Sequence, residues 1–346
     1  MSRHSTTAVA LAAAAVLASG AALAQDKHTL KIATFAPKPS TASIWFEKTR
    51  ADVAKKSEGR LEIQVFYGSS MGPMPRHYDL ARKGVADMSF FQHGVTPGRF
   101  PLTELTHAPY LFPAGAKGAV VGAKVAGDLM GKYFQAEHQA AGTRGLWIVF
   151  NRPSGVYDSE KPIMAVADLN GRRYRAPTPT DVLMMKALGA APIGMPATHM
   201  AESLQKGTID GVVTDPMGIF AFKLGNLVKH YTPMFISVIS FGLALNPKSY
   251  DKLPKDLRPL IDALGTKAAG VEMATLAWGQ DPPPFTKYMN GLKLNRVSLP
   301  AAADEQMRAL GEKIMGERVA ALEKKGLPAR KVYDELKALS AKYSAM

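Results

Sequence analysis

The sequence predicts an α/β protein built from two lobes, with a set of helices added at the end. Strand and helix patterns alternate along the first part of the chain, and the same order then returns with different residues. From Leu253 onward the pattern is helical only. The length of 346 residues fits this division, because a domain typically takes about 150 residues.

The first lobe is predicted from alternating apolar residues, which indicate strands, and from apolar residues spaced three or four apart, which indicate helices. Because helical crossovers join parallel strands, we expect a parallel sheet. The strands are expected at 30–35, 61–67 and 88–91, and the helices at 44–56 and 78–83.

The order of strands and helices repeats after a Gly/Ala-rich helical region at 115–139. Strands are expected at 146–150, 172–176 and 209–213, and a helix at 181–188. The helical patterns at 256–278, 302–324 and 329–343 are expected to pack outside both sheets and tie the lobes together. We therefore divide the chain into a signal peptide (1–24), lobe I (25–150), lobe II (151–245) and bridging helices (246–346).

The N-terminus has the pattern of a secretory signal peptide. Arg3 and His4 precede an apolar run at 8–18, and an Ala-x-Ala ending at 22–24 predicts cleavage before Gln25. The apolar run is too short to span a bilayer, and so is the later stretch at 234–245. We therefore expect an exported, periplasmic protein.

Composition excludes several kinds of site. The chain has no cysteine, which excludes disulfide scaffolds, cysteine nucleophiles and cysteine-ligated metals. Histidine pairs, calcium-loop spacings and nucleotide-binding glycine motifs are absent, so no metal and no cofactor are expected. The net charge of +14 fits a small acidic ligand, an anionic membrane surface or merely a solvated basic surface. Nucleic acid is not expected as a partner, because the basic residues are spread out and do not alternate with aromatics.

The segment 68–72 matches the G-x-S-x-G nucleophile motif around Ser70, and it follows a predicted strand. An α/β-hydrolase would place more strands before this motif, and Pro73 and Pro75 disfavour a tight turn into a helix. A small-residue loop at a ligand cleft is the preferred interpretation. An exported serine hydrolase using Ser70 remains the alternative function.

The segment 170–181 is more informative, because a strand ends there and a helix begins. Alternation places Arg173 and Arg175 on one face, with Arg175 at the carboxyl end of the strand, where open α/β sheets bind ligands. Thr180 can cap the helix, whose free N–H groups favour an anion. A guanidinium at this point is suited to binding a carboxylate. The alternative is that the arginines only cover an edge strand.

With this segment, the sequence resembles the solute-binding proteins of tripartite ATP-independent periplasmic (TRAP) transporters. The resemblance extends over nearly the whole chain after the signal peptide, and its motifs lie at 30–35, 65–72, 84–87, 108–112, 161–163, 168–171 with Arg175, 188–192 and 204–211. It implies two α/β lobes of periplasmic binding protein type that close on an organic acid, bridged by long helices. It also implies a monomer with no catalysis, which delivers its ligand to the permease subunits of a TRAP transporter. From the residues alone, an ABC-type permease would serve as well.

The resemblance also implies site residues. Arg175 takes the place of the family's selectivity arginine, Thr178, Thr214 and Asp215 lie where polar ligand contacts are expected, and Phe91, Gln92 and His93 are expected on the opposite wall. Met184, one turn into the helix after Arg175, is expected to add an apolar contact. Thr214-Asp215 replaces the Glu-Trp pair of the metal-assisted keto-acid binders, which argues against a bound metal.

Binders of large acidic sugars in this family carry a second arginine at a position that is Gly155 here. Arg152 lies three residues away, so either Arg152 reaches the ligand or the second charge is absent. A second ligand charge without a partner would be costly to bury. The expected ligand is therefore a monocarboxylate with an apolar or aromatic body.

Overall fold

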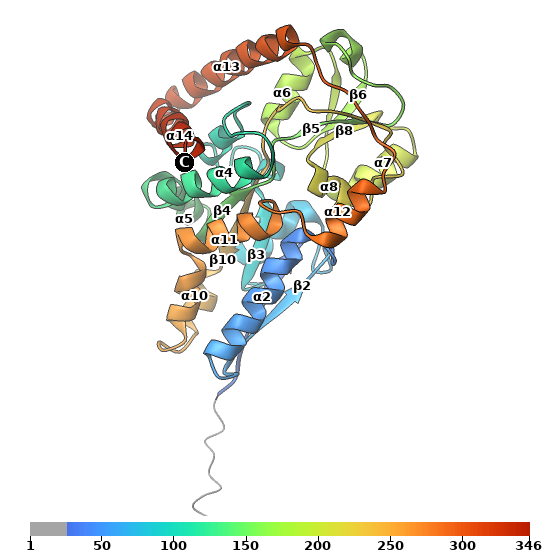
Figure 1. Cartoon of the computed structure of the whole chain (residues 1–346). Coiled ribbons are helices and arrows are strands. Elements are labelled where there is room, and N and C mark those ends of the chain that lie inside the picture. Colours follow the sequence, from blue (N-terminus) through green and yellow to red (C-terminus); the bar gives the residue numbers. More distant parts are fainter. Residues whose placement is uncertain (1–25) are drawn as a thin grey trace, which may run out of the picture.

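The computed structural model describes residues 26–346, which form two β-sheets with helices packed against both (Figure 1). The predicted α/β class with two lobes is confirmed. The predicted signal peptide (1–24) lies outside the described residues. None of the helices in the described part is long and apolar enough to cross a membrane.

The first lobe is built on a five-stranded sheet with the order β2-β1-β3-β10-β4. Its strands are β1 (His28–Thr34), β2 (Leu61–Phe66), β3 (Met88–Gln92), β4 (Arg144–Phe150) and β10 (Ser240–Leu245). The pairs β1–β2 and β1–β3 are parallel, as predicted, whereas β10 is antiparallel to both β3 and β4. The predicted lobe II, 151–245, includes β10, and this boundary is wrong for that strand because β10 belongs to the first sheet. The partners of β10 lie far earlier in the chain, so no local pattern could indicate its return.

Helices cover both faces of this sheet. They are α2 (Thr41–Lys56), α3 (His77–Arg82), α4 (Gly115–Leu129) and α5 (Gln135–Ala140), with a π-helical turn η4 (Met130–Phe134) between the last two and short 3-10 turns η1 (Met74–Arg76), η2 (His93–Val95) and η3 (Thr103–His107). A capping box between Ser40 and Ser43 starts α2. Trp45 and Phe46 on this helix are fully buried, and Trp45 packs edge-on against Trp147 of β4. Burial of this aromatic face holds α2 on the sheet.

The second lobe is built on a six-stranded sheet with the order β11-β9-β5-β8-β6-β7. Its strands are β5 (Gly155–Asp158), β6 (Arg173–Ala176), β7 (Ala191–Gly194), β8 (Gly211–Thr214), β9 (His230–Thr232) and β11 (Asn295–Arg296). Its helices are η5 (Val166–Leu169), α6 (Pro179–Ala187), η6 (Ala197–His199), α7 (Met200–Gln205) and α8 (Pro216–Ala221). Strand β6 pairs in parallel with β7 and β8 on its two sides. It is therefore an interior strand, and the interpretation of its arginines as the cover of an edge strand is wrong.

The C-terminal helices pack on both lobes. They are α9 (Pro247–Asp251), α10 (Arg258–Leu264), α11 (Lys267–Ala277), α12 (Pro283–Asn290), α13 (Ala301–Glu323) and α14 (Ala329–Ser344), so the single helix predicted at 256–278 is divided in two. Helix α11 packs on α2 and α4 of the first lobe, and α12 packs on α8 of the second. Helix α13 runs from α6 to α14, which lies on α4, and so connects the two lobes (Figure 1).

Two histidines are fully buried among aromatic rings in the first lobe. The His93 and His138 rings both pack against Phe91 and Phe100, and the Nδ1 atom of His138 lies 3.2 Å from Thr143 Oγ1. Burial lowers the pKa of each histidine to about 3. Both side chains are therefore neutral in the folded protein, even at moderately acidic pH.

The buried His138 is expected to make stability fall with falling pH. Its folded pKa of about 3 lies below the ordinary value of 6.5, so between these values the unfolded chain binds a proton that the folded chain does not. Its contribution is complete above pH 6.5 and decreases by about 1.4 kcal/mol per pH unit on acidification. In His138→Asn, the slope of unfolding free energy against pH, measured with urea between pH 4.5 and 6, should be smaller by this amount. Equal slopes in the two proteins would contradict this assignment.

Candidate ligand-binding site

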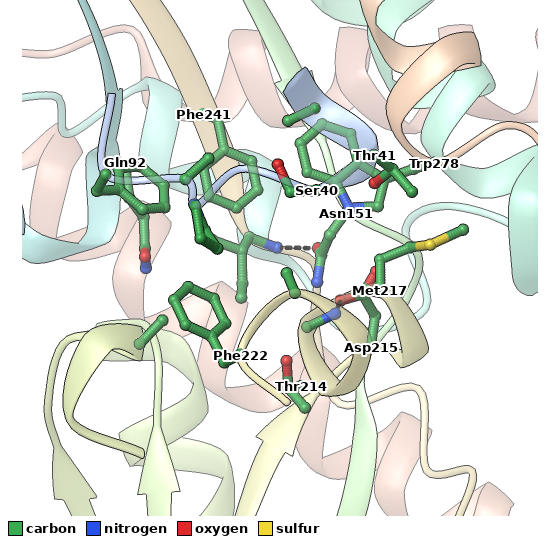
Figure 2. Close-up of a pocket in the computed structure, with 18 of the residues that line it drawn as sticks. Ser40, Thr41, Gln92, Asn151, Thr214, Asp215, Met217, Phe222, Phe241 and Trp278 are labelled. Carbon is green, nitrogen blue, oxygen red and sulfur yellow. Dashed lines mark hydrogen bonds between the residues drawn. The ribbon is translucent and has the colours of Figure 1, made fainter. Parts of the chain in front are cut away.

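A small cavity lies between the two lobes (Figure 2). Phe241 and Ser40 of the first lobe face Phe222 and Thr214 of the second across it. Pockets that are mostly apolar with a few polar groups are typical binding sites for small organic molecules. This cavity has that character, since most of its lining residues are apolar.

Arg175 supplies a buried positive charge to the cavity. It stands near the carboxyl end of β6, and only 1% of the residue is exposed. Its Nε donates to the Met195 carbonyl and its Nη1 to the Val213 carbonyl, both at 3.1 Å, while the buried Nη2 has no partner. Burial lowers the pKa of Arg175 to about 10, which still leaves it charged at neutral pH. A buried cation with a free donor favours an anion beside it.

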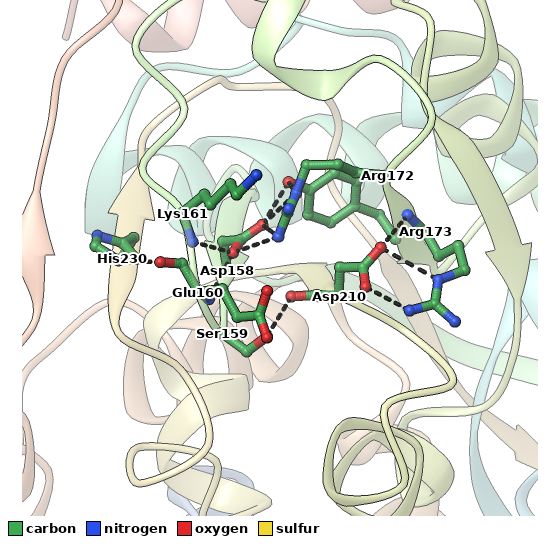
Figure 3. A network of polar contacts seen from close by, with 9 residues as sticks. Asp158, Ser159, Glu160, Lys161, Arg172, Arg173, Asp210 and His230 are labelled. Carbon is green, nitrogen blue, oxygen red and sulfur yellow. Dashed lines mark hydrogen bonds and ion pairs between the residues drawn. The ribbon is translucent and has the colours of Figure 1, made fainter.

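The other two arginines of this segment are occupied. Arg172 makes a salt bridge with the buried Asp158 at 2.6 Å, and Arg173 makes one with Asp210 at 2.6 Å (Figure 3). This network lies at the amino end of β6, away from the cavity. Arg175 is thus the member of the group whose guanidinium makes no salt bridge and keeps a buried nitrogen without a partner.

Asp181 and Thr178 form a buried polar pair behind the start of α6. Thr178 caps the helix by accepting from the Asp181 N–H, and its hydroxyl donates to the Asp181 carboxylate, which also accepts from Ser237. Burial raises the pKa of Asp181 to about 6, against the opposing effect of Arg175. Thr178 is therefore engaged within α6 and does not line the cavity where the sequence analysis expected a ligand contact.

The structure answers the question left open about a second charge. Arg152 turns toward the segment after α11: its Nε donates to the Trp278 carbonyl at 2.7 Å, and its Nη2 forms a 2.6 Å ion pair with Asp281. Gly155 leaves no room for a side chain, because a Cβ there would lie 2.7 Å from the Thr232 carbonyl oxygen. Among the described residues that line the cavity, Arg175 is the only arginine or lysine.

One wall of the cavity is a stack of aromatic rings. Phe35, Phe90 and Phe241 pack with centroid separations of 5.2 to 6.0 Å, and Trp278 stacks on Phe241 at 5.1 Å with an interplanar angle of 8°. All four residues are buried. Such a wall offers flat apolar surface to a ring-shaped ligand.

Strand β3 shows why two predicted wall residues lie elsewhere. Successive side chains of a strand point to opposite faces, so Phe90 lines the cavity while Phe91 packs against Tyr78 and Phe100 on the other side of the sheet. His93 belongs to the same aromatic cluster, and its Nδ1 lies 3.3 Å from the Ser240 carbonyl oxygen. Neither Phe91 nor His93 lines the cavity.

Gln92 lines the cavity and also joins the two lobes. Its amide Nε2 donates to the Pro177 carbonyl of the second lobe at 2.8 Å. Nearby, a Cβ on Gly94 would lie only 3.1 Å from the same carbonyl oxygen and 3.2 Å from Thr178 Cγ2. The lobes therefore meet closely at this point.

Thr214 and Asp215 contribute polar groups from the end of β8. Asp215 caps α8, with its Oδ1 accepting from the Gly218 N–H at 3.0 Å. Burial raises the pKa of Asp215 to about 6, although Gly218, Arg152 and Asn151 act in the opposite direction. Both Thr214 and Asp215 line the cavity.

Met184 does not line the cavity, because it faces the core of the second lobe with Leu169 and Tyr174. Of the eight residues expected at the site, the structure brings four together at the cavity: Gln92, Arg175, Thr214 and Asp215.

Sequence reasoning missed several lining residues as candidate contacts, including Phe35, Ser40, Thr41, Asn151, Met217, Phe222 and Trp278. The segment 35–41 could have been recognised as part of a site, because a strand ends there and a serine caps the next helix. No local sequence pattern indicates that Phe222 or Trp278 lines a cavity.

The Ser70 motif does not form a nucleophile elbow. Ser70 is exposed in a turn after β2, and the next helical element is the short η1 (Met74–Arg76). Within the described residues, no hydrogen bond joins Ser70 to a histidine, as an activated serine would require. The geometry gives no support to the hydrolase alternative.

Comparisons with known proteins agree in the kind of protein they match. The family model described as bacterial extracellular solute-binding protein, family 7 (DctP), matches residues 32–318. A solute-binding protein of Albidiferax ferrireducens is 24% identical over 220 residues. That alignment covers 63% of this chain, and the chain spans 64% of the length of that relative.

Two solved structures match over almost their whole length. A TRAP solute-binding protein from Rhodoferax ferrireducens, in complex with copurified benzoate, is 25% identical with a TM-score of 0.84. A marine metagenome TRAP solute-binding protein specific for aromatic acid ligands, in complex with 3-hydroxybenzoate, is 26% identical with a TM-score of 0.82. Each match covers 92% of this chain and 99% of the other.

Proposed function

The chain belongs to the DctP family of bacterial extracellular solute-binding proteins, family 7, and is a TRAP solute-binding protein; from this premise we propose that it captures an aromatic monocarboxylate between its lobes. The observation that carries the proposal is the buried Nη2 of Arg175, which has no partner in a cavity walled by aromatic rings. A carboxylate beside this atom would complete its hydrogen bonding and neutralise its charge.

The charge balance of the cavity supports a single carboxylate. Arg175 is the one arginine or lysine among the described lining residues, while Arg152 is paired with Asp281 and position 155 cannot hold a side chain. A second carboxylate would be buried without a cation and would meet the Asp215 side chain. Dicarboxylates and acidic sugars are therefore disfavoured.

The shape and lining of the cavity support an aromatic body for the ligand. The stack of Phe35, Phe90, Phe241 and Trp278 provides flat apolar contacts, and burying a ring against such a surface is favourable. The two solved structures named above hold benzoate and 3-hydroxybenzoate, which have this chemistry.

The wider role follows from the family, which consists of substrate-binding receptors that work with membrane components. The proposed partners are the permease subunits of a TRAP transporter, to which the protein delivers its ligand as a periplasmic monomer. Cleavage of the signal peptide before Gln25 belongs to the same proposal. The proposed role predicts that the protein binds its ligand and does not convert it to a product.

A thermal-shift screen tests the ligand class. Benzoate and other aromatic monocarboxylates are expected to raise the melting temperature most, with succinate, malate and a sialic acid at least about 100-fold weaker in Kd because a second charge or polar body is unpaired. At a hundredfold excess over Kd, a ligand adds about 2.7 kcal/mol of stability.

The same screen with the Arg152→Ala variant is the control, because it tests whether Arg152 supplies a second positive charge to the ligand. It removes a charge that contacts Asp281 rather than the cavity, so the ranking of ligands should stay the same. If a dicarboxylate or sugar acid stabilises the protein most, and Arg152→Ala abolishes that effect, the proposed ligand class is wrong.

A further inference from the structure

Two side-chain atoms around the cavity are buried and lack a partner. They are Arg175 Nη2, a donor, and Asp215 Oδ2, an acceptor. Among the described residues that line the cavity, no other side-chain nitrogen or oxygen is both fully buried and without a hydrogen bond. A carboxylate explains the first atom and leaves the second unexplained. An unpaired buried acceptor is costly, so a group that fills it gains affinity.

The role of Asp215 as a helix cap does not account for its second oxygen. The cap uses Oδ1, which accepts from the Gly218 N–H, and a serine or asparagine would cap the helix as well. Only 3% of Asp215 is exposed, so water contributes little to the solvation of Oδ2. The Asp215 carboxylate therefore has one hydrogen-bond acceptor, Oδ2, that no group in the described part of the protein uses.

The neighbouring donors do not satisfy Oδ2: the Arg152 N–H and the Asn151 amide lie near enough to lower the pKa of Asp215, but no donor of the described residues reaches Oδ2 in hydrogen-bond geometry. The Asn151 amide is held at both ends, accepting from the Ile239 N–H at 2.6 Å and donating to Ser154 Oγ at 3.3 Å. The guanidinium of Arg152 donates to the Trp278 and Gln280 carbonyls and to Asp281. Asp215 Oδ2 is thus left for a donor that arrives with the ligand.

We propose that Asp215 is a specificity-determining residue that accepts a hydrogen bond from a hydroxyl group on the aromatic ring of the ligand. This inference rests on the proposed function, since it concerns the same cavity and the same carboxylate-binding arginine. A hydroxyl group has one donor and matches one free acceptor. An ammonium group has three donors, and the largely apolar lining would leave the others unpaired. The ligand class is therefore a hydroxylated aromatic monocarboxylate.

Calorimetry with benzoate and its 2-, 3- and 4-hydroxy derivatives tests the assignment. At least one hydroxy isomer is expected to bind the natural protein about 10- to 100-fold more tightly than benzoate, the range for a hydrogen bond to a charged group. In Asp215→Ser the ratio of the benzoate Kd to the Kd of that isomer should fall below about threefold, and this ratio is the readout whatever the change in the affinity for benzoate itself. Serine keeps a capping oxygen for α8 and lacks the second oxygen.

The outcomes separate the two proposals. If benzoate binds and no hydroxy isomer gains, or if the gain survives in Asp215→Ser, the role of Asp215 is overturned and the aromatic-acid proposal stands. If none of the four acids binds the natural protein, both proposals fail. Should Asp215→Ser fail to fold, as judged by its thermal unfolding without ligand, Asp215→Asn replaces it, because asparagine keeps the cap and substitutes a donor for Oδ2.

Discussion

Replacement of Arg175 by alanine is expected to weaken the binding of an aromatic acid by about thirty- to several-thousand-fold. Removing one member of a buried, hydrogen-bonded charge pair costs roughly 2 to 5 kcal/mol. The position of the side chain supports the upper part of this range, because Arg175 is 1% exposed and two of its nitrogens are held by backbone carbonyls. Calorimetry of the variant against the natural protein measures the loss.

Two further variants show whether the effect is specific. Arg175→Lys should also lose much of the affinity, because an ammonium group cannot reproduce the fork of guanidinium donors. Arg173→Ala is the matched control on the same strand: its salt bridge with Asp210 is partly exposed and lies away from the cavity. A Kd for Arg175→Ala within about threefold of the natural protein would place the anion elsewhere.

A bulky side chain at Gly94 is expected to hold the lobes apart. A Cβ there would approach the Pro177 carbonyl oxygen to 3.1 Å and Thr178 to 3.2 Å, so the larger Gly94→Leu side chain must push the second lobe away. Overpacking of this kind costs about 1 to 3 kcal/mol and reduces the fraction of protein in the binding-competent arrangement. Apparent affinity should therefore fall about 5- to 150-fold.

Small-angle scattering gives the structural readout of this prediction. The natural protein should show a smaller radius of gyration when a ligand closes the lobes, and Gly94→Leu should show a larger radius at the same ligand concentration. Gly194→Leu is the control, since a Cβ at Gly194 meets nothing within 4 Å at the same interlobe groove. Unchanged affinity and an unchanged radius in Gly94→Leu would argue for a pocket that binds without closure.

Several polar residues of the candidate site could be expected near one another because they lie at the carboxyl ends of strands. Arg175 and Thr214 are near or at the ends of β6 and β8, and Gln92 ends β3, so alternation and the resemblance placed them near one another. The error at β3 has a definite cause. Alternation tells that Phe90 and Phe91 face opposite ways, but it does not tell which face of the sheet meets the other lobe.

The sequence by itself determined the α/β class, the order of most elements, the family and the candidate anion-binding arginine, because these depend on local periodicity and on motifs of a few adjacent residues. The tertiary structure alone decided which arginine makes no salt bridge, since Arg172 pairs with Asp158 of β5 and Arg173 pairs with Asp210, which directly precedes β8. It also decided that Arg152 pairs with Asp281 and does not line the cavity. Only the tertiary structure shows that β10 pairs in the first sheet and that Trp278 stacks on Phe241. In each case the partners are far apart along the chain, and only packing of the folded lobes brings them within contact distance.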